Sequence, residues 1–250
     1  MASPITSDGW VFRIGGASAI LGSLMAMIGN LLHPMTPVGD PTGVGHAIHG
    51  SDAWTIIHMT IVVGLILMLG GLMAIGASLR GPFASATARF GWAAALVGVT
   101  VGLILVTLDG IAAKQIADAW AQAPSAEQAA ALRDLVAEET MNFALVALFN
   151  IVFAGVTFIL YGLAVASSDV YPRWLGWPVV VAGIGSIAVG MIQAQVGEST
   201  GISRVASIVF PTIITVWVAT LGVLLLRRAA RLDSSFIEAG FRHAQGATTS

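Results

Sequence analysis

Four histidines and two carboxylates are the side chains of this sequence best suited to bind a metal or to move protons. They are His33, His46, His49, His58, Asp109 and Glu139. Imidazole suits zinc, copper and iron, and a carboxylate can complete a metal site that keeps open coordination positions. The sequence has no cysteine, which excludes thiolate ligands and a cysteine nucleophile. These residue types predict acid–base or metal-assisted chemistry, and a divalent metal is the cofactor that they would suit.

The elements that position these residues are membrane-spanning helices. Hydrophobic residues make up 56% of the 250 residues and charged residues 10%, against roughly 25% charged residues in an average soluble domain. Six apolar segments are long enough to cross the hydrocarbon core, where only helices satisfy their own backbone. They cover about residues 10–33, 54–79, 90–113, 141–166, 174–196 and 205–227. The net charge of −2 offers no basic surface to nucleic acid, so membrane lipids are the expected partners.

The basic residues predict the orientation of the spans. Eight of the eleven lie in segments on the same side as the N-terminus, and positive charge marks the cytoplasmic side. Both termini are therefore expected in the cytoplasm, with a six-span domain over 1–231 and a polar tail over 232–250. The run Arg173 to Trp177, Arg-Trp-Leu-Gly-Trp, resembles the start of a late span in six-helix membrane proteins of bacteria. It suits the inner interface, and we expect a bacterial-type cytoplasmic membrane.

Two outer connections are longer than turns. Residues 34–53 are rich in proline and glycine and contain His46 and His49. Residues 114–140 have the pattern of an amphipathic helix broken at Pro124, with a capping box from Ser125 to Gln128. Its apolar stripe consists of Leu132, Leu135 and Val136. The expected fold is an all-α integral membrane protein, a six-helix bundle whose third loop forms a surface helix, caps the bundle or runs into the fourth span.

Small residues at helical spacing predict which faces of the spans pack together. One series runs along the first span and leads to His33: Gly15, Ala19, Gly22, Ala26 and Gly29. Another runs along the third span and leads to Asp109: Gly91, Ala95, Gly98 and Gly102. We expect His33, its neighbour Asn30 and Asp109 to face the bundle. His58 lies off the small-residue face of the second span, so it faces another neighbour or lies at the headgroups.

The polar groups in the outer halves of the spans suggest one shared pocket. We expect His33, Asp109 and Glu139 to be catalytic there, in a membrane enzyme that acts on a lipidic or isoprenoid-like substrate. Four amides are expected to bind the substrate: Asn30, Asn142, Asn150 and Gln193. These amides could equally join helices by hydrogen bonds. The sequence leaves open a small-molecule or proton-coupled transporter, and an accessory subunit that forms oligomers through its Gly/Ala series.

Overall fold

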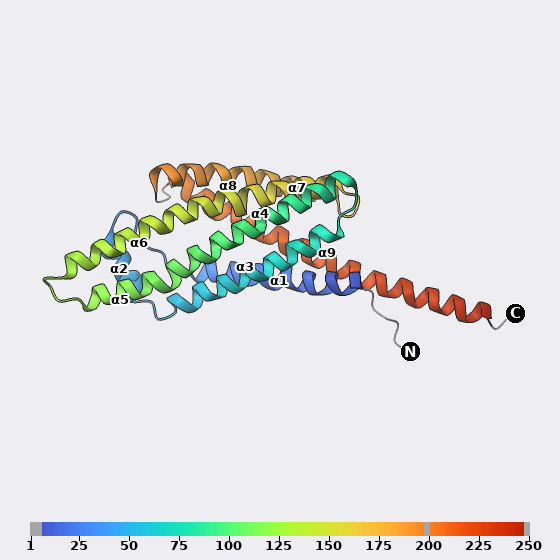
Figure 1. Ribbon diagram of the computed structural model, residues 1–250, viewed down its shortest axis with the longest axis horizontal. Coiled ribbons are helices and arrows are strands. Elements are labelled where there is room, and N and C mark those ends of the chain that lie inside the picture. The colour runs from blue at the N-terminus through green and yellow to red at the C-terminus, as the bar shows by residue number, and fades with distance from the viewer. Residues whose placement is uncertain (1–6, 198–200, 248–250) are drawn as a thin grey trace.

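The protein is a bundle of long helices (Figure 1). The computed structural model describes residues 7–197 and 201–247, with side chains for 9–197 and 201–232. The helices are α1 (Ser7–Leu32), α2 (Pro41–His49), α3 (Trp54–Ser78), α4 (Pro82–Thr107), η1 (Leu108–Ala113), α5 (Lys114–Gln122), α6 (Gln128–Phe149), η2 (Asn150–Thr157), α7 (Phe158–Ser167), η3 (Arg173–Leu175), α8 (Gly176–Val196) and α9 (Gly201–Ala247). No strand occurs in these described ranges. The prediction of an all-α chain is confirmed.

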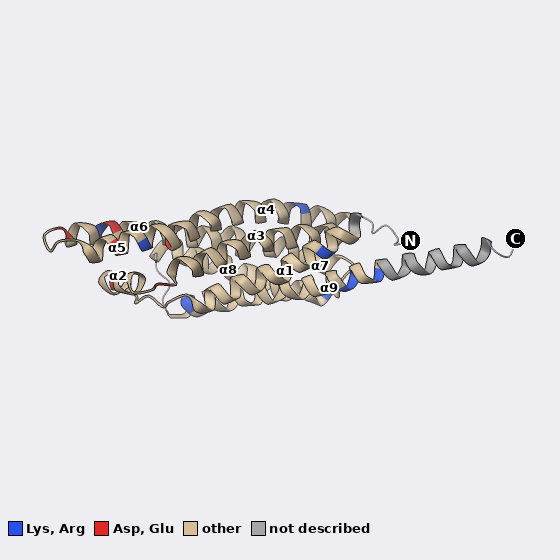
Figure 2. Ribbon diagram, turned by 90° about the horizontal axis from the view of Figure 1, so that it is seen from below, with Lys and Arg blue, Asp and Glu red and all other residues tan. Residues whose placement is uncertain are grey.

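Six helical stretches are long and apolar enough to cross a membrane, as predicted. They are Gly9–Leu32, Trp54–Ser78, Pro82–Gln122, Gln128–Ser167, Arg173–Val196 and Gly201–Leu232. Figure 2 shows the described charged residues gathered toward the two ends of the bundle, with a long uncharged stretch between them. Such a distribution suits a bilayer, because charge is costly in the hydrocarbon core. The chain therefore has the make-up of a multi-pass membrane protein.

The third loop differs from the expected surface helix. The third span continues without a break to Gln122, and the fourth begins at Gln128, so α5 and α6 extend their spans as a hairpin. The helix α2 packs against this hairpin, and together they form a cap at one end of the bundle (Figure 1). The apolar core of the cap contains Val44, Ile48, Trp54, Ala113, Ala117 and Leu135. Leu135 is fully buried here and Leu132 packs against this core, whereas Val136, the third residue of the apolar stripe, is 41% exposed.

The expected capping box at Ser125 is absent. The residue that precedes α6 is Glu127, and no side chain caps that end of the helix. The backbone N–H groups of Glu127 and Gln128 instead donate to the carbonyl oxygen of Pro124, at 2.8 and 3.1 Å. A turn after Pro124 thus takes over the bonding that the capping box was expected to supply.

The small-residue series of α1 marks a helix–helix contact, as predicted, and the partner is α3. Ala19 and Ala26 are buried, and a methyl group added to Gly22 would meet the backbone of Met68 and Gly64 at 2.6 and 2.7 Å. Leu21, one residue away, is 53% exposed. The two helix backbones therefore approach closely along one face, and that face ends beside His33.

The series of α4 packs mainly against the fourth span. Gly98 lies against Phe153, and Gly102 lies between Phe149 of α6 and Leu65 of α3. From Leu108 to Ala113 the helix widens into the π-helical turns of η1. A π turn changes the phase of a helix, and such turns often occur at functional sites. This change places Asp109 and Gly110 against the first turns of α3.

The last helix, α9, contains Pro211 in its interior. Beyond the span, α9 continues to Ala247. The expected polar tail, 232–250, coincides with this extension, and its side chains from residue 233 onward lie outside the described residues.

Candidate metal centre

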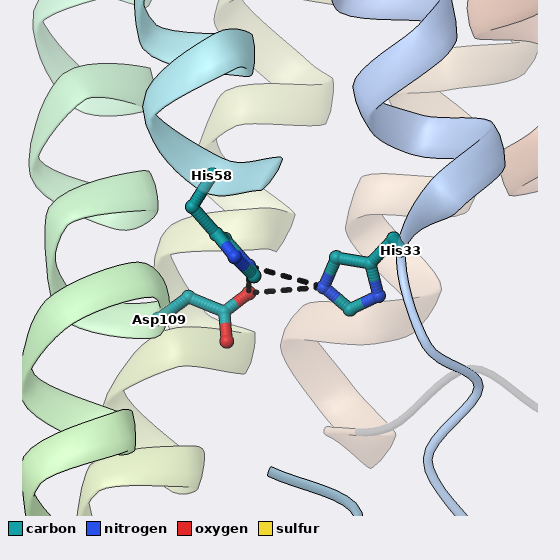
Figure 3. Close-up of side chains that lie close together, drawn as sticks. All are labelled: His33, His58 and Asp109. Carbon is teal, nitrogen blue, oxygen red and sulfur yellow. Dashed lines mark hydrogen bonds and ion pairs between the residues drawn. The ribbon is translucent and has the colours of Figure 1, made fainter. Parts of the chain in front are cut away.

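Three side chains from distant parts of the chain meet at the base of the cap. His33 directly follows α1, His58 lies in the second turn of α3, and Asp109 lies in η1. His58 Nε2 is 3.1 Å from Asp109 Oδ2 and 3.1 Å from His33 Nε2. The distance from His33 Nε2 to Asp109 Oδ2 is 3.7 Å. Figure 3 shows the two imidazole rings and the carboxylate converging on one small space. These atoms form a group that could hold a metal ion.

The backbone fixes which ring nitrogens face this space. His58 Nδ1 lies 2.6 Å from the carbonyl oxygen of Trp54, and His33 Nδ1 lies 2.9 Å from that of Pro34. A carbonyl oxygen only accepts, so each Nδ1 carries a proton and donates it. In a neutral ring the Nε2 then has a free lone pair, and this is the orientation that metal-binding histidines commonly have.

Two side chains of α3 hold η1 in place beside these histidines. Trp54 Nε1 donates to the carbonyl oxygen of Asp109 at 2.7 Å, and Thr55 Oγ1 donates to that of Gly110 at 2.9 Å. The ring of Trp54 also lies 4.9 Å from that of His33 and 4.8 Å from that of His58, between centroids. Trp54 is 1% exposed. One buried tryptophan therefore positions all three members of the group.

The group is closed on one side and open on the other. The side chain of His58 is 2% exposed, whereas those of His33 and Asp109 are 30% and 21% exposed. Exposed apolar residues lie beside His33 in the chain, around the end of α1. These are Leu31, Leu32 and Met35, each more than half exposed. Such a surface suits lipid.

The three ligand atoms are spaced as a bound transition metal requires. A point equidistant from them lies roughly 1.9 Å from each, close to the bond lengths of about 2.0–2.2 Å that zinc forms with nitrogen and oxygen. Ligands of an ion at about 2.1 Å are separated by about 3.0 Å in octahedral and about 3.4 Å in tetrahedral geometry. Two histidines and one carboxylate leave open positions for water or substrate, as in catalytic zinc and non-haem iron sites.

The other two histidines of the expected metal set lie in α2 and have different neighbours. The His46 ring packs edge-on against Trp120, with centroids 4.9 Å apart. His49 Nδ1 lies 2.7 Å from Asp118 Oδ1, and Lys114 donates to the same oxygen at 2.8 Å. The group of potential ligands includes neither His46 nor His49. Their contacts join α2 to α5 within the cap.

Glu139 and Asn30, expected at the site, lie in other surroundings. Glu139 lines a groove of about 160 Å³ between α6 and residues 37–44, together with Asp40 and Phe143. Asn30 is exposed and donates to the carbonyl oxygen of Ala26 on its own helix, at 2.8 Å. The expected inward orientation of Asn30 is therefore wrong. Asn30 follows Gly29 of the packed face in sequence, but its own side chain points away from the bundle.

The remaining amides lie inside the bundle. Asn150 Nδ2 donates to Gln193 Oε1 at 2.7 Å and joins the fourth span to the fifth, whereas the Oδ1 atom of buried Asn142 has no hydrogen-bond partner. Glu138, which the site prediction did not include, is 2% exposed, and neither of its carboxylate oxygens has a hydrogen-bond partner. The spacing Leu135, Glu138, Asn142 is the signal that could have revealed it, since these three share one helical face.

Comparison of the chain with known protein families, curated proteins and solved structures gives no match.

Proposed function

We propose that the protein is a membrane metalloenzyme in which His33, His58 and Asp109 bind a divalent transition metal, Zn²⁺ or Fe²⁺. One observation carries the proposal. Two imidazole Nε2 atoms and one carboxylate oxygen face one another within 3.7 Å, and the Nδ1–H groups of both rings donate to backbone carbonyl oxygens. Three lone pairs so close together repel unless a proton or a metal cation lies between them. A metal ion is the occupant that would use all three lone pairs.

The surroundings of the centre support a lipidic or isoprenoid-like substrate. Leu31, Leu32 and Met35 beside His33 are 76%, 62% and 71% exposed. A substrate with an apolar chain would lie along this surface and bring its polar end to the open coordination positions. There the metal would polarise a substrate oxygen or activate a bound water. It is the metal-assisted chemistry that the residue types predict.

The core of the bundle favours an enzyme over a transporter. Phe149, Phe153, Phe158 and Trp217 form a chain of ring contacts in the middle of the bundle, with centroids 5.0–6.0 Å apart. Packed aromatic rings leave little room for a polar path from the centre to the opposite face. An accessory subunit would have no need of three converging ligand atoms, although the Asn150–Gln193 bond is the kind of helix-joining contact it would use.

The proposed topology places the cap and the centre outside, with both termini in the cytoplasm of a bacterial-type cell. Its support is the bias of arginine and lysine toward the other end of the bundle. A metal centre on the outer face would take its ion and water from that side.

Metal analysis of the full-length protein, purified without chelators, tests the proposal. We expect about one zinc or iron per chain. Metal-free protein titrated with Co²⁺ should develop the visible absorption of a coordinated ion. His33→Ala and Asp109→Asn should lose most of this binding.

His49→Ala is the matched control, because His49 is also a histidine paired with an aspartate. It should bind the metal as wild type does. Equal binding by wild type and His33→Ala would refute the centre, and so would a loss in His49→Ala of the same size. Thermal unfolding of each variant in detergent separates loss of the site from loss of the fold.

A further inference from the structure

Glu138 is a carboxyl group without a visible counter-charge. It lies on α6, 2% exposed, and neither of its side-chain oxygens makes a hydrogen bond to any residue that the structure describes. The two charged groups that act on it, Glu139 and Asp109, are both negative. A carboxylate in such surroundings would bear the full cost of leaving water and of repulsion by its neighbours. A positive charge must therefore be bound there, as a proton or as a metal cation.

Asn142 helps to decide between a proton and a metal cation. It lies one turn after Glu138 on the same helical face, it is 6% exposed, and its Oδ1 atom has no partner. Three orphaned oxygens are too few for Ca²⁺, which takes six to eight oxygen ligands, and Mg²⁺ demands a near-ideal octahedron. A single proton on Glu138, by contrast, would create a hydroxyl donor one turn before Asn142 on the same helical face. A hydrogen bond from that hydroxyl to the Asn142 amide oxygen would satisfy two buried groups at once.

We infer that Glu138 and Asn142 form a proton-binding site that is coupled to the metal centre, and that Glu138 releases its proton when a divalent cation binds beside Asp109. The coupling rests on the proposed function, whereas the proton-binding site does not. The cation would offset the negative charge of Asp109 and would make an ionised Glu138 less costly. In the step, the O–H bond of Glu138 breaks, the carboxylate keeps the electron pair, and the proton leaves to water.

Infrared spectroscopy of the metal-free protein at neutral pH tests the proton-binding site. A protonated carboxyl group has a carbonyl stretching band that a carboxylate lacks. We expect this band in wild type and in Glu139→Gln, and its loss in Glu138→Gln, which has the shape of the protonated acid. Asn142→Leu should retain the band but shift it to higher frequency, because the hydrogen-bond acceptor is gone. Absence of the band from wild type, or its survival in Glu138→Gln, would overturn the proposal.

Addition of Zn²⁺ tests the coupling. We expect the Glu138 band to weaken as the ion binds. Calorimetry in two buffers of different ionisation enthalpy should show that wild type releases about one more proton per ion than Glu138→Gln. Zinc that binds without changing the band or the proton count would overturn the coupling but leave the metal centre intact. Failure of zinc to bind would refute the proposed function, while the metal-free spectra would still decide the proton-binding site.

Discussion

Gly110 lies so close to His58 that one added methyl group should open the metal centre without altering any ligand. In Gly110→Ala the new Cβ would lie 2.3 Å from His58 Cβ and 2.8 Å from His58 Cγ, whereas ordinary contacts begin at 3.4 Å. The two residues must therefore separate by about 1.1 Å, because a packed interior transmits such strain. If the whole shift lies along the line from His58 Nε2 to Asp109 Oδ2, their 3.1 Å distance would grow to about 4.2 Å, which is the upper bound.

That separation is too large for one ion to bind both atoms well. With bonds of about 2.1 Å, an ion reaches two atoms about 4.2 Å apart only when it lies in line between them. We expect the affinity for Co²⁺ or Zn²⁺ to fall by about 10–100-fold, a loss of about 1.4–2.7 kcal/mol of binding free energy. Overpacking should also lower the stability of the fold by about 1–3 kcal/mol. Titration of metal-free protein in detergent measures the affinity, and thermal unfolding measures the stability.

Gly70→Ala is the control for this experiment. It also adds a methyl group to a membrane-spanning glycine, but its nearest neighbour, Ser18 Cβ, lies 3.8 Å away. Metal affinity and stability should both stay near those of wild type. A Gly110→Ala protein that binds the metal within a factor of two of wild type would show that Gly110 does not set the position of His58.

Three further outcomes are expected. Gly22→Leu should destabilise the fold by about 1–3 kcal/mol or more, because the new side chain separates the backbones of α1 and α3. The control Leu21→Met should leave stability unchanged. Equal unfolding temperatures of the two variants would contradict this packing. Asp109→Asn should keep the unfolding temperature of the metal-free protein but lose Co²⁺ binding, and retained binding would remove the carboxylate from the centre. A cysteine at exposed Thr42 should react with a membrane-impermeant reagent in intact cells, whereas one at exposed Ala86 should react only after the cells are permeabilised. The reverse pattern would show that the topology is inverted.

The sequence predicted the six spans, and it placed His33 and Asp109 of the candidate metal centre on inward faces because regular helical spacing marks those faces. The small-residue face of α1 leads directly to His33, and that of α4 leads to Asp109. Ordinary helix geometry suffices for these two inferences. The membrane-crossing segments follow from length and apolar composition alone.

His58 was among the candidate ligands, but its place beside Asp109 and the burial of Glu138 required the three-dimensional structure. His58 meets Asp109 because η1 departs from α-helical geometry, and no pattern of residue types marks a π turn in advance. The one local signal is Gly110 next to Asp109, a residue without a side chain where another helix approaches closely. Glu138 and Glu139 are adjacent and chemically alike, so only the phase of α6, set by burial of Leu135, shows which one faces inward.

The continuity of the third span gives the cap a mechanical connection to the metal centre. Residues Pro82–Gln122 form one helix of 41 residues, which corresponds to a rod about 60 Å long. The hydrocarbon core is about 30 Å thick, so about half of the rod stands outside it. Asp109 lies partway along this rod, in the segment where its turns are widest. A movement of the tip of the cap would therefore be transmitted along this helix to Asp109, the carboxylate of the candidate metal centre.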